Sequence, residues 1–85
     1  MKSDTQRILT EILSERDRQR EKWGGDFEDD IRKDPIDWAS DIQAYATWAK
    51  QMMRMRSHEK YRKRMMQIAA LAVAACESFD RQETK

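Results

Sequence analysis

Apolar residues recur at steps of three and four in three segments of the chain, which is the spacing of one face of an α-helix. The first segment carries Ile8, Leu9, Ile12 and Leu13. The second carries Trp38, Ile42, Tyr45, Ala49 and Met52, and the third carries Tyr61, Met65, Ile68, Ala72, Ala75 and Phe79. The pattern predicts an all-α fold with helices over about 4–23, 35–55 and 58–80.

Polar residues at the predicted helix ends support these boundaries. Ser3 with Gln6 fits a capping box before the first helix, and Gly24-Gly25 follows its end. Asp34 is the N-cap candidate of the second helix, and Pro35 suits its first position. Since the chain has only two Gly and one Pro, it lacks the turn residues that a β-rich fold needs.

The segment 68–76 is apolar on every side, which is typical of a helix buried all round. The second and third helices are joined by a few residues around 55–57, so we expect an antiparallel hairpin. The first helix is too narrow to cover the apolar segment. We therefore expect a helical-bundle homo-oligomer, most simply a dimer; the alternative is a loose monomeric three-helix bundle.

Length and composition limit the possible classes of protein. The chain of 85 residues allows a single domain over 1–85, with 39% apolar and 39% charged residues and a net charge of +1. It has no apolar run that could span a membrane and no secretory leader, so we expect a cytoplasmic protein without a membrane partner. Its single Cys76 excludes an internal disulfide and a cysteine-based zinc site.

Charge is divided into two blocks. Residues 26–41 hold seven acids and two bases, and residues 54–64 hold six bases and one acid. The loop 24–34 lacks the EF-hand pattern and is expected to be a solvated linker. The basic tip of the hairpin could bind phosphates; alternatively, it is solvated or pairs with the acidic loop of a second subunit. Sequence-specific binding of nucleic acid is not expected.

The candidate binding residues lie on the charged half of the first helix and at the basic tip, where Arg would form bidentate bonds to phosphate or carboxylate. They are Arg16, Arg18, Gln19, Lys22 and Trp23, with Arg54, Arg56, Lys60, Arg62 and Arg64. Two pairs of acids at helical spacing could meet at one end of the hairpin and hold magnesium, although acids at helix ends commonly have other roles. These are Asp37 with Asp41, and Glu77 with Asp80.

Several motifs carry a family resemblance over about residues 8 to 81. The segment Glu15–Gly24 reads Glu-Arg-x-Arg-Gln-x-x-Lys-Trp-Gly, and Trp38 and the alanine-rich stretch Met66–Arg81 follow an acidic loop. These features resemble a group of small phage and prophage proteins, which are similar to MazG-like members of the all-α NTP pyrophosphatase superfamily. The resemblance implies a helical oligomer with magnesium held by Glu-x-x-Glu on the second helix and Glu-x-x-Asp on the third.

This chain departs from that pattern where the metal ligands would stand. Residues 41–47 contain no Glu, and Arg64-x-x-Gln67 occupies the place of Glu-x-x-Asp. An arginine in place of a ligand acid repels magnesium. We therefore expect a small, non-catalytic, phage-encoded helical oligomer without a cofactor. We expect it to bind a host protein, such as a defence or replication factor that it inhibits, or a nucleotide. The alternatives are a divergent magnesium-dependent nucleoside triphosphate pyrophosphohydrolase and a structural or assembly protein.

Overall fold

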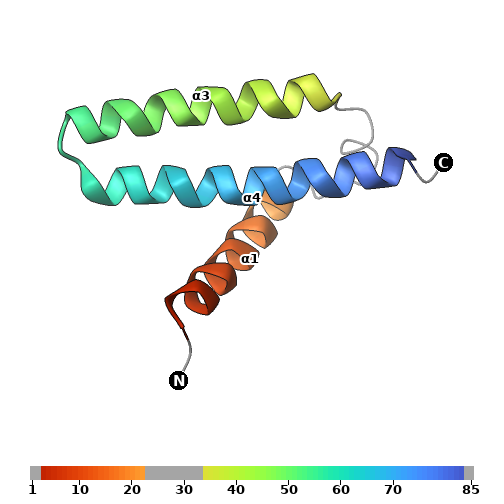
Figure 1. Ribbon diagram of the computed structural model, residues 1–85, viewed down its shortest axis with the longest axis horizontal. Helices are drawn as coiled ribbons and strands as arrows, with labels where there is room; N and C mark the ends of the chain where they lie inside the picture. The colour runs from red at the N-terminus through yellow and green to blue at the C-terminus, as the bar shows by residue number, and fades with distance from the viewer. Residues whose placement is uncertain (1–2, 23–33, 84–85) are drawn as a thin grey trace.

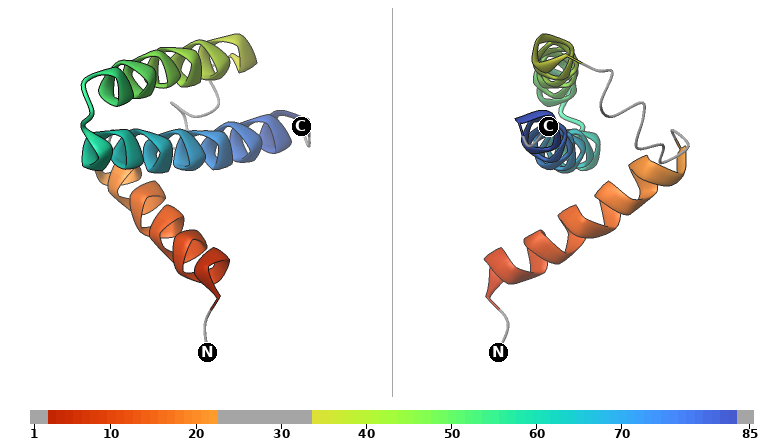
Figure 2. Two further views of the ribbon diagram at one scale, coloured as in Figure 1. Left: turned by 60° about the vertical axis from the view of Figure 1, so that its left-hand side comes forward. Right: turned by 90° about the vertical axis from the view of Figure 1, so that its right-hand side faces the viewer.

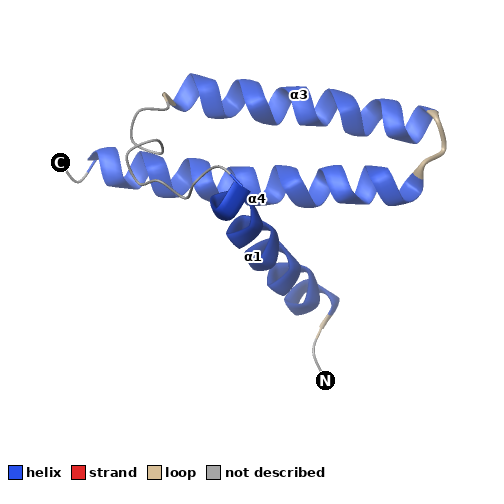
Figure 3. Cartoon of the chain, turned by 180° about the vertical axis from the view of Figure 1, so that it is seen from behind, coloured by secondary structure: helices blue, strands red, loops and turns tan. Residues whose placement is uncertain are grey.

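The computed structural model describes residues 3–22 and 34–83, and over these ranges the chain is helical without strands (Figure 1, Figure 3). Helix α1 spans Asp4–Lys22, α3 spans Pro35–Arg54 and α4 spans His58–Glu83. The predicted all-α fold is confirmed. The third helix extends three residues beyond the expected position 80. No described helix is both long enough and apolar enough to cross a lipid bilayer.

Side-chain caps begin α1 and α3 where the sequence indicates. The amide of Gln6 donates to Ser3 Oγ at 3.1 Å, and the amide of Ser3 donates to Gln6 Oε1 at 3.3 Å. Asp34 is the N-cap of α3, and its amide donates to the Asp37 carboxylate at 3.2 Å. These bonds use amides that a helix start leaves without intrahelical partners.

A short turn at residues 55–57 ends α3 and leads into α4. The amide of Ser57 donates to the carbonyl of Met52 at 2.8 Å, and that of Arg56 donates to the carbonyl of Met53 at 3.0 Å. This pair of bonds is a Schellman cap. The cap places Arg56 in the left-handed region, with φ at 59°. Glycine is the usual residue at such a position because it has no Cβ.

Helices α3 and α4 lie side by side, and a small core sits between them (Figure 1, Figure 2). Its buried residues are Trp38, Leu71 and Ala74, against which Ile42, Tyr45 and Ala75 pack half-buried. On α3 the apolar residues that are buried or half-buried match the predicted stripe. They are Trp38, Ile42, Tyr45, Ala49 and Met52.

On α4 the predicted stripe was wrong by about one position. Four of its members are exposed in the single chain: Tyr61, Met65, Ala72 and Phe79. The buried residues are Gln67, Ala70, Leu71, Ala74 and Ser78. The reason is that α4 packs against both α3 and α1, so its buried face lies between these two contacts. The remaining face of the apolar segment is open in the single chain.

Helix α1 crosses α4 obliquely, and its N-terminal half projects away from the α3–α4 pair (Figure 1, Figure 2). Residues 3–10 are all exposed, whereas Arg16 and Gln19 in the charged half are buried against α4. The helix is thus attached by its polar end. Its apolar end is left largely uncovered.

Candidate functional site

Two arginines of α1 converge on one carboxylate of α4. Arg16 Nε donates to Glu77 Oε1 at 2.9 Å, and Arg20 Nη2 donates to Glu77 Oε2 at 3.2 Å. The Arg16 residue is only 4% exposed. A charge-assisted bond at such a shielded position is stronger than one in open water. It fixes where α1 crosses α4.

Gln19 continues this polar contact one turn further along α1. It is 1% exposed, and its Nε2 donates to the carbonyl oxygen of Gln67 and to Glu15 Oε2, each at 3.4 Å. Its Oε1 accepts no hydrogen bond within the described ranges. Because a buried acceptor without a donor destabilises the fold, this oxygen is ready to accept one.

The guanidinium of Arg64 lies over two aromatic rings of α3. Its Cζ is 5.2 Å from the centroid of Trp48 and 5.8 Å from that of Tyr45, within the range of cation–π attraction. The two rings meet edge to face, with centroids 5.0 Å apart. Arg64 Nη1 donates to Gln67 Oε1 at 2.9 Å, so one hydrogen bond and two rings set its orientation.

The charge of Arg64 is not balanced by a carboxylate in the part of the chain that the structure describes. The side chain is half-buried, and Trp48 beside it is 45% exposed. An oriented cation with limited hydration and no counter-charge attracts an anion. The exposed ring beside it provides a surface for stacking.

Arg18 adds a second guanidinium on the α1 side. Its Nε donates to Glu15 Oε1 at 2.9 Å, and this hydrogen bond raises the pKa of Arg18. Glu15 Oε2 in turn accepts a hydrogen bond from Gln19 Nε2, so Glu15 connects Arg18 to Gln19. A hollow of about 360 Å³ beside Arg18 and Glu15 also borders Thr10, Ser14 and Met66.

All three described helices thus contribute to one cluster, which we call the three-helix junction. It consists of Glu15, Arg18 and Gln19 on α1, Tyr45 and Trp48 on α3, and Arg64 and Gln67 on α4. Hydrogen bonds through Glu15 and Gln67 connect the predicted Arg18, Gln19 and Arg64. Trp48 lies off the predicted stripe of its helix, so the sequence allowed a contact with a ligand or a subunit interface, but neither Trp48 nor Tyr45 was among the predicted site residues.

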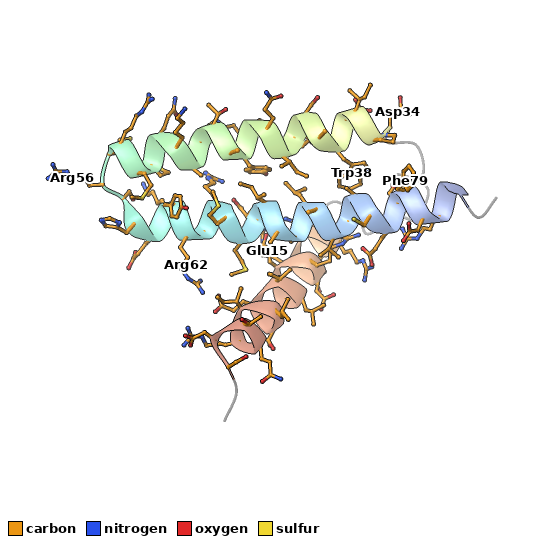
Figure 4. All side chains as sticks on the ribbon, viewed as in Figure 1. Glu15, Asp34, Trp38, Arg56, Arg62 and Phe79 are labelled. Carbon is orange, nitrogen blue, oxygen red and sulfur yellow. The ribbon has the colours of Figure 1, made fainter. Side chains whose placement is uncertain are left out.

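The other predicted binding residues lie elsewhere. Arg62 pairs with Glu11 through two bonds of 2.8 and 3.0 Å, which lower the pKa of Glu11 and raise that of Arg62. Arg54, Arg56 and Lys60 are exposed near the α3–α4 turn, where Arg56 points outward (Figure 4). The side chain of Lys22, all of Trp23 and residues 24–33 of the predicted loop over 24–34 lie outside the described residues.

The structure does not gather the four acids considered as metal ligands into one metal-binding group. Asp37 caps α3, and both oxygens of Glu77 accept from arginines. Asp41 is half-buried and Asp80 is exposed. Within residues 3–22 and 34–83, no group of three or more His, Cys, Asp or Glu is arranged to hold a metal ion.

The magnesium centre implied by the family resemblance does not fit the residues at the corresponding positions. Arg64 and Gln67 stand in place of the expected acids of α4, and Arg64 faces Tyr45 and Trp48 rather than carboxylates. Magnesium requires oxygen ligands, at least some of them charged. The donors found here are cationic or aromatic, which suits an anion instead.

Compared with known proteins, the chain matches no family model, no curated sequence and no solved structure. The candidate site therefore rests on its own geometry.

Proposed function

We propose that this chain is a non-catalytic helical protein that binds a nucleotide at the three-helix junction without a metal ion. The observation that carries the proposal is the half-buried Arg64, held by Gln67 and two rings with no carboxylate partner among the described residues. The resemblance to phage and prophage proteins points to the cytoplasm of a host cell as its setting.

The chemistry of the junction suits the two parts of a nucleotide. Guanidinium groups bind phosphate oxygens through paired, charge-assisted hydrogen bonds, and Arg64 and Arg18 provide two such groups. Exposed Trp48 offers a surface on which a base can stack, an interaction that contributes about 1–3 kcal/mol per base. The fixed position of Arg64 reduces the entropy lost on binding.

The three other functions receive less support. A pyrophosphohydrolase needs acids that hold magnesium, and the described residues offer no such group. Binding to a host protein would use exposed Arg54, Arg56 and Lys60, yet these side chains have no fixed arrangement comparable to the junction. An assembly role alone does not explain why Arg64, which has no carboxylate partner among the described residues, is held in one orientation by Gln67 and two rings.

Self-association is part of the proposal. We take α3 and α4 as an antiparallel hairpin, because they lie side by side and are joined by the turn at 55–57. The open face of α4 and the projecting apolar half of α1 leave large side chains exposed, among them Leu9, Leu13 and Val73. Burial of these side chains in a homo-oligomer is favourable, because it removes apolar surface from water.

Thermal unfolding with a panel of nucleotides, in EDTA and in magnesium, tests the proposal. A ligand at 100 times its dissociation constant adds about 2.7 kcal/mol to the free energy of unfolding. This raises the midpoint temperature of unfolding by several degrees for a domain of this size. We expect one class of nucleotide to raise the midpoint in EDTA. A panel without any shift would contradict nucleotide binding and favour a protein partner, to be sought by pull-down from the host.

A further inference from the structure

We infer that a second copy of this chain docks on one apolar surface formed by the N-terminal half of α1 and the adjoining side of α4. This inference rests on the self-association proposed above and adds the surface and the symmetry. We call this docking surface the α1–α4 apolar surface. It comprises Ile8, Leu9, Ile12, Leu13, Met65 and Ala69.

One part of the surface is a ridge on α1. Leu9 is 53% exposed and Leu13 is 63% exposed, and they lie four residues apart, so their side chains are neighbours along one side of the helix. Leu13 is within the stretch of α1 that approaches α4, yet it remains open. An exposed leucine alone is ordinary, but two in line next to an apolar hollow form a continuous patch.

The other part is a groove between α1 and α4. It has a volume of about 170 Å³ and is lined by Ile8 and Ile12 on one side and by Met65, Met66 and Ala69 on the other. Arg62 also lines the groove. Methionine adapts its shape to an incoming side chain, and the small Ala69 leaves room for close approach. The groove therefore suits an aliphatic side chain.

The ridge and the groove lie side by side on the same helix, and this arrangement favours a second copy as the partner. Ile8 and Ile12 line the groove, whereas the next residues, Leu9 and Leu13, form the ridge. A two-fold axis between two copies of α1 places the ridge of each copy in the groove of the other. Such a self-complementary contact closes a dimer and leaves no open end.

The exposed side chains of this surface favour such a dimer. Four of its large apolar residues are open in the single chain: Ile8 at 38%, Leu9 at 53%, Leu13 at 63% and Met65 at 37% exposed. Burial of these side chains against a second copy removes apolar surface from water, which stabilises the dimer. The ion pair between Arg16 and Glu77 holds α1 on α4 without using the ridge, so the apolar residues stay available.

Light scattering of the full chain and two matched variants tests the inference. In Leu13→Glu, a charge at the centre of the ridge should convert the protein from twice the chain mass of 10.2 kDa to the chain mass, with helical circular dichroism retained. Ile36→Glu is the control, because Ile36 is 76% exposed at the start of α3, outside the surface. This control should remain a dimer.

The possible outcomes separate the surface from self-association itself. A monomeric wild type overturns both the proposed self-association and the α1–α4 apolar surface. A wild type that is oligomeric while Leu13→Glu keeps the same mass overturns only the α1–α4 apolar surface. If Leu13→Glu loses its helical signal, Leu13→Gln replaces it, and the dissociation constant from dilution should rise at least tenfold; an unchanged constant overturns the surface.

Discussion

The guanidinium carbon of Arg64 lies 5.2 Å from the ring centroid of Trp48, on a neighbouring helix. The contact joins a half-buried cation to an exposed aromatic ring, and within the described residues no carboxylate balances the cation. A cation in this arrangement attracts an anion. We therefore regard this pair as the centre of the proposed binding site.

Glu77 is one of the residues that attach α1 to α4, because it accepts hydrogen bonds from Arg16 and Arg20. Glu77→Gln should lower the free energy of unfolding by about 2 kcal/mol, because a shielded arginine loses its counter-charge. The loss is smaller than for a fully buried pair, since Glu77 is partly exposed. Urea denaturation measures it. Asp80→Asn, an exposed acid three residues on, is the control and should change stability by less than about 0.5 kcal/mol.

The pair formed by Glu11 and Arg62 makes stability depend on pH. The hydrogen bond from Arg62 lowers the pKa of Glu11 below its ordinary value of 4.5. A carboxylate with a lowered pKa stabilises the fold above its unfolded-state pKa and loses this effect as the pH falls through its folded-state value. The urea midpoints of wild type and Glu11→Gln should differ above about pH 4.5 and converge at lower pH.

If the urea midpoints of wild type and Glu11→Gln differ by the same amount over the whole pH range, the carboxylate charge of Glu11 does not stabilise the fold. The Thr10→Val variant, which changes an exposed neighbour without altering a charge, should keep the pH dependence of the wild type.

The left-handed conformation of Arg56 predicts a stabilising substitution. Arg56→Gly should raise the free energy of unfolding by roughly 0.5–1 kcal/mol, because glycine removes the Cβ strain of this conformation. The matched variant Arg54→Gly, in the last turn of α3, should instead lower stability by roughly 1 kcal/mol. Thermal unfolding of both variants provides the comparison. Destabilisation by Arg56→Gly would mean that the arginine side chain itself stabilises the turn.

The helices were predictable because local signals agree. Apolar spacing placed them, and the caps at Ser3 and Asp34 marked two of their starts. The buried face of α4 was not predictable from spacing, since residues 68–76 are apolar in every direction and no period selects a face. Only the positions of α1 and α3 decide which side is covered.

The binding residues were predicted individually but not as a group. Arg18, Gln19 and Arg64 were candidates because arginine and amide groups bind anions, yet their meeting depends on the angle at which α1 crosses α4 (Figure 2). Burial of Arg16 was also missed. A run of charged residues usually indicates a solvated face, and only the position of Glu77 on another helix explains why Arg16 is shielded.

Calorimetric titration of ATP in EDTA tests the central claim most directly, with wild type, Arg64→Ala and Arg54→Ala compared in one buffer. The account predicts saturable binding without magnesium, affinity at least about tenfold weaker in Arg64→Ala because a charge-assisted bond is lost, and unchanged affinity in Arg54→Ala. Binding that requires magnesium, or equal affinity in wild type and Arg64→Ala, would contradict it.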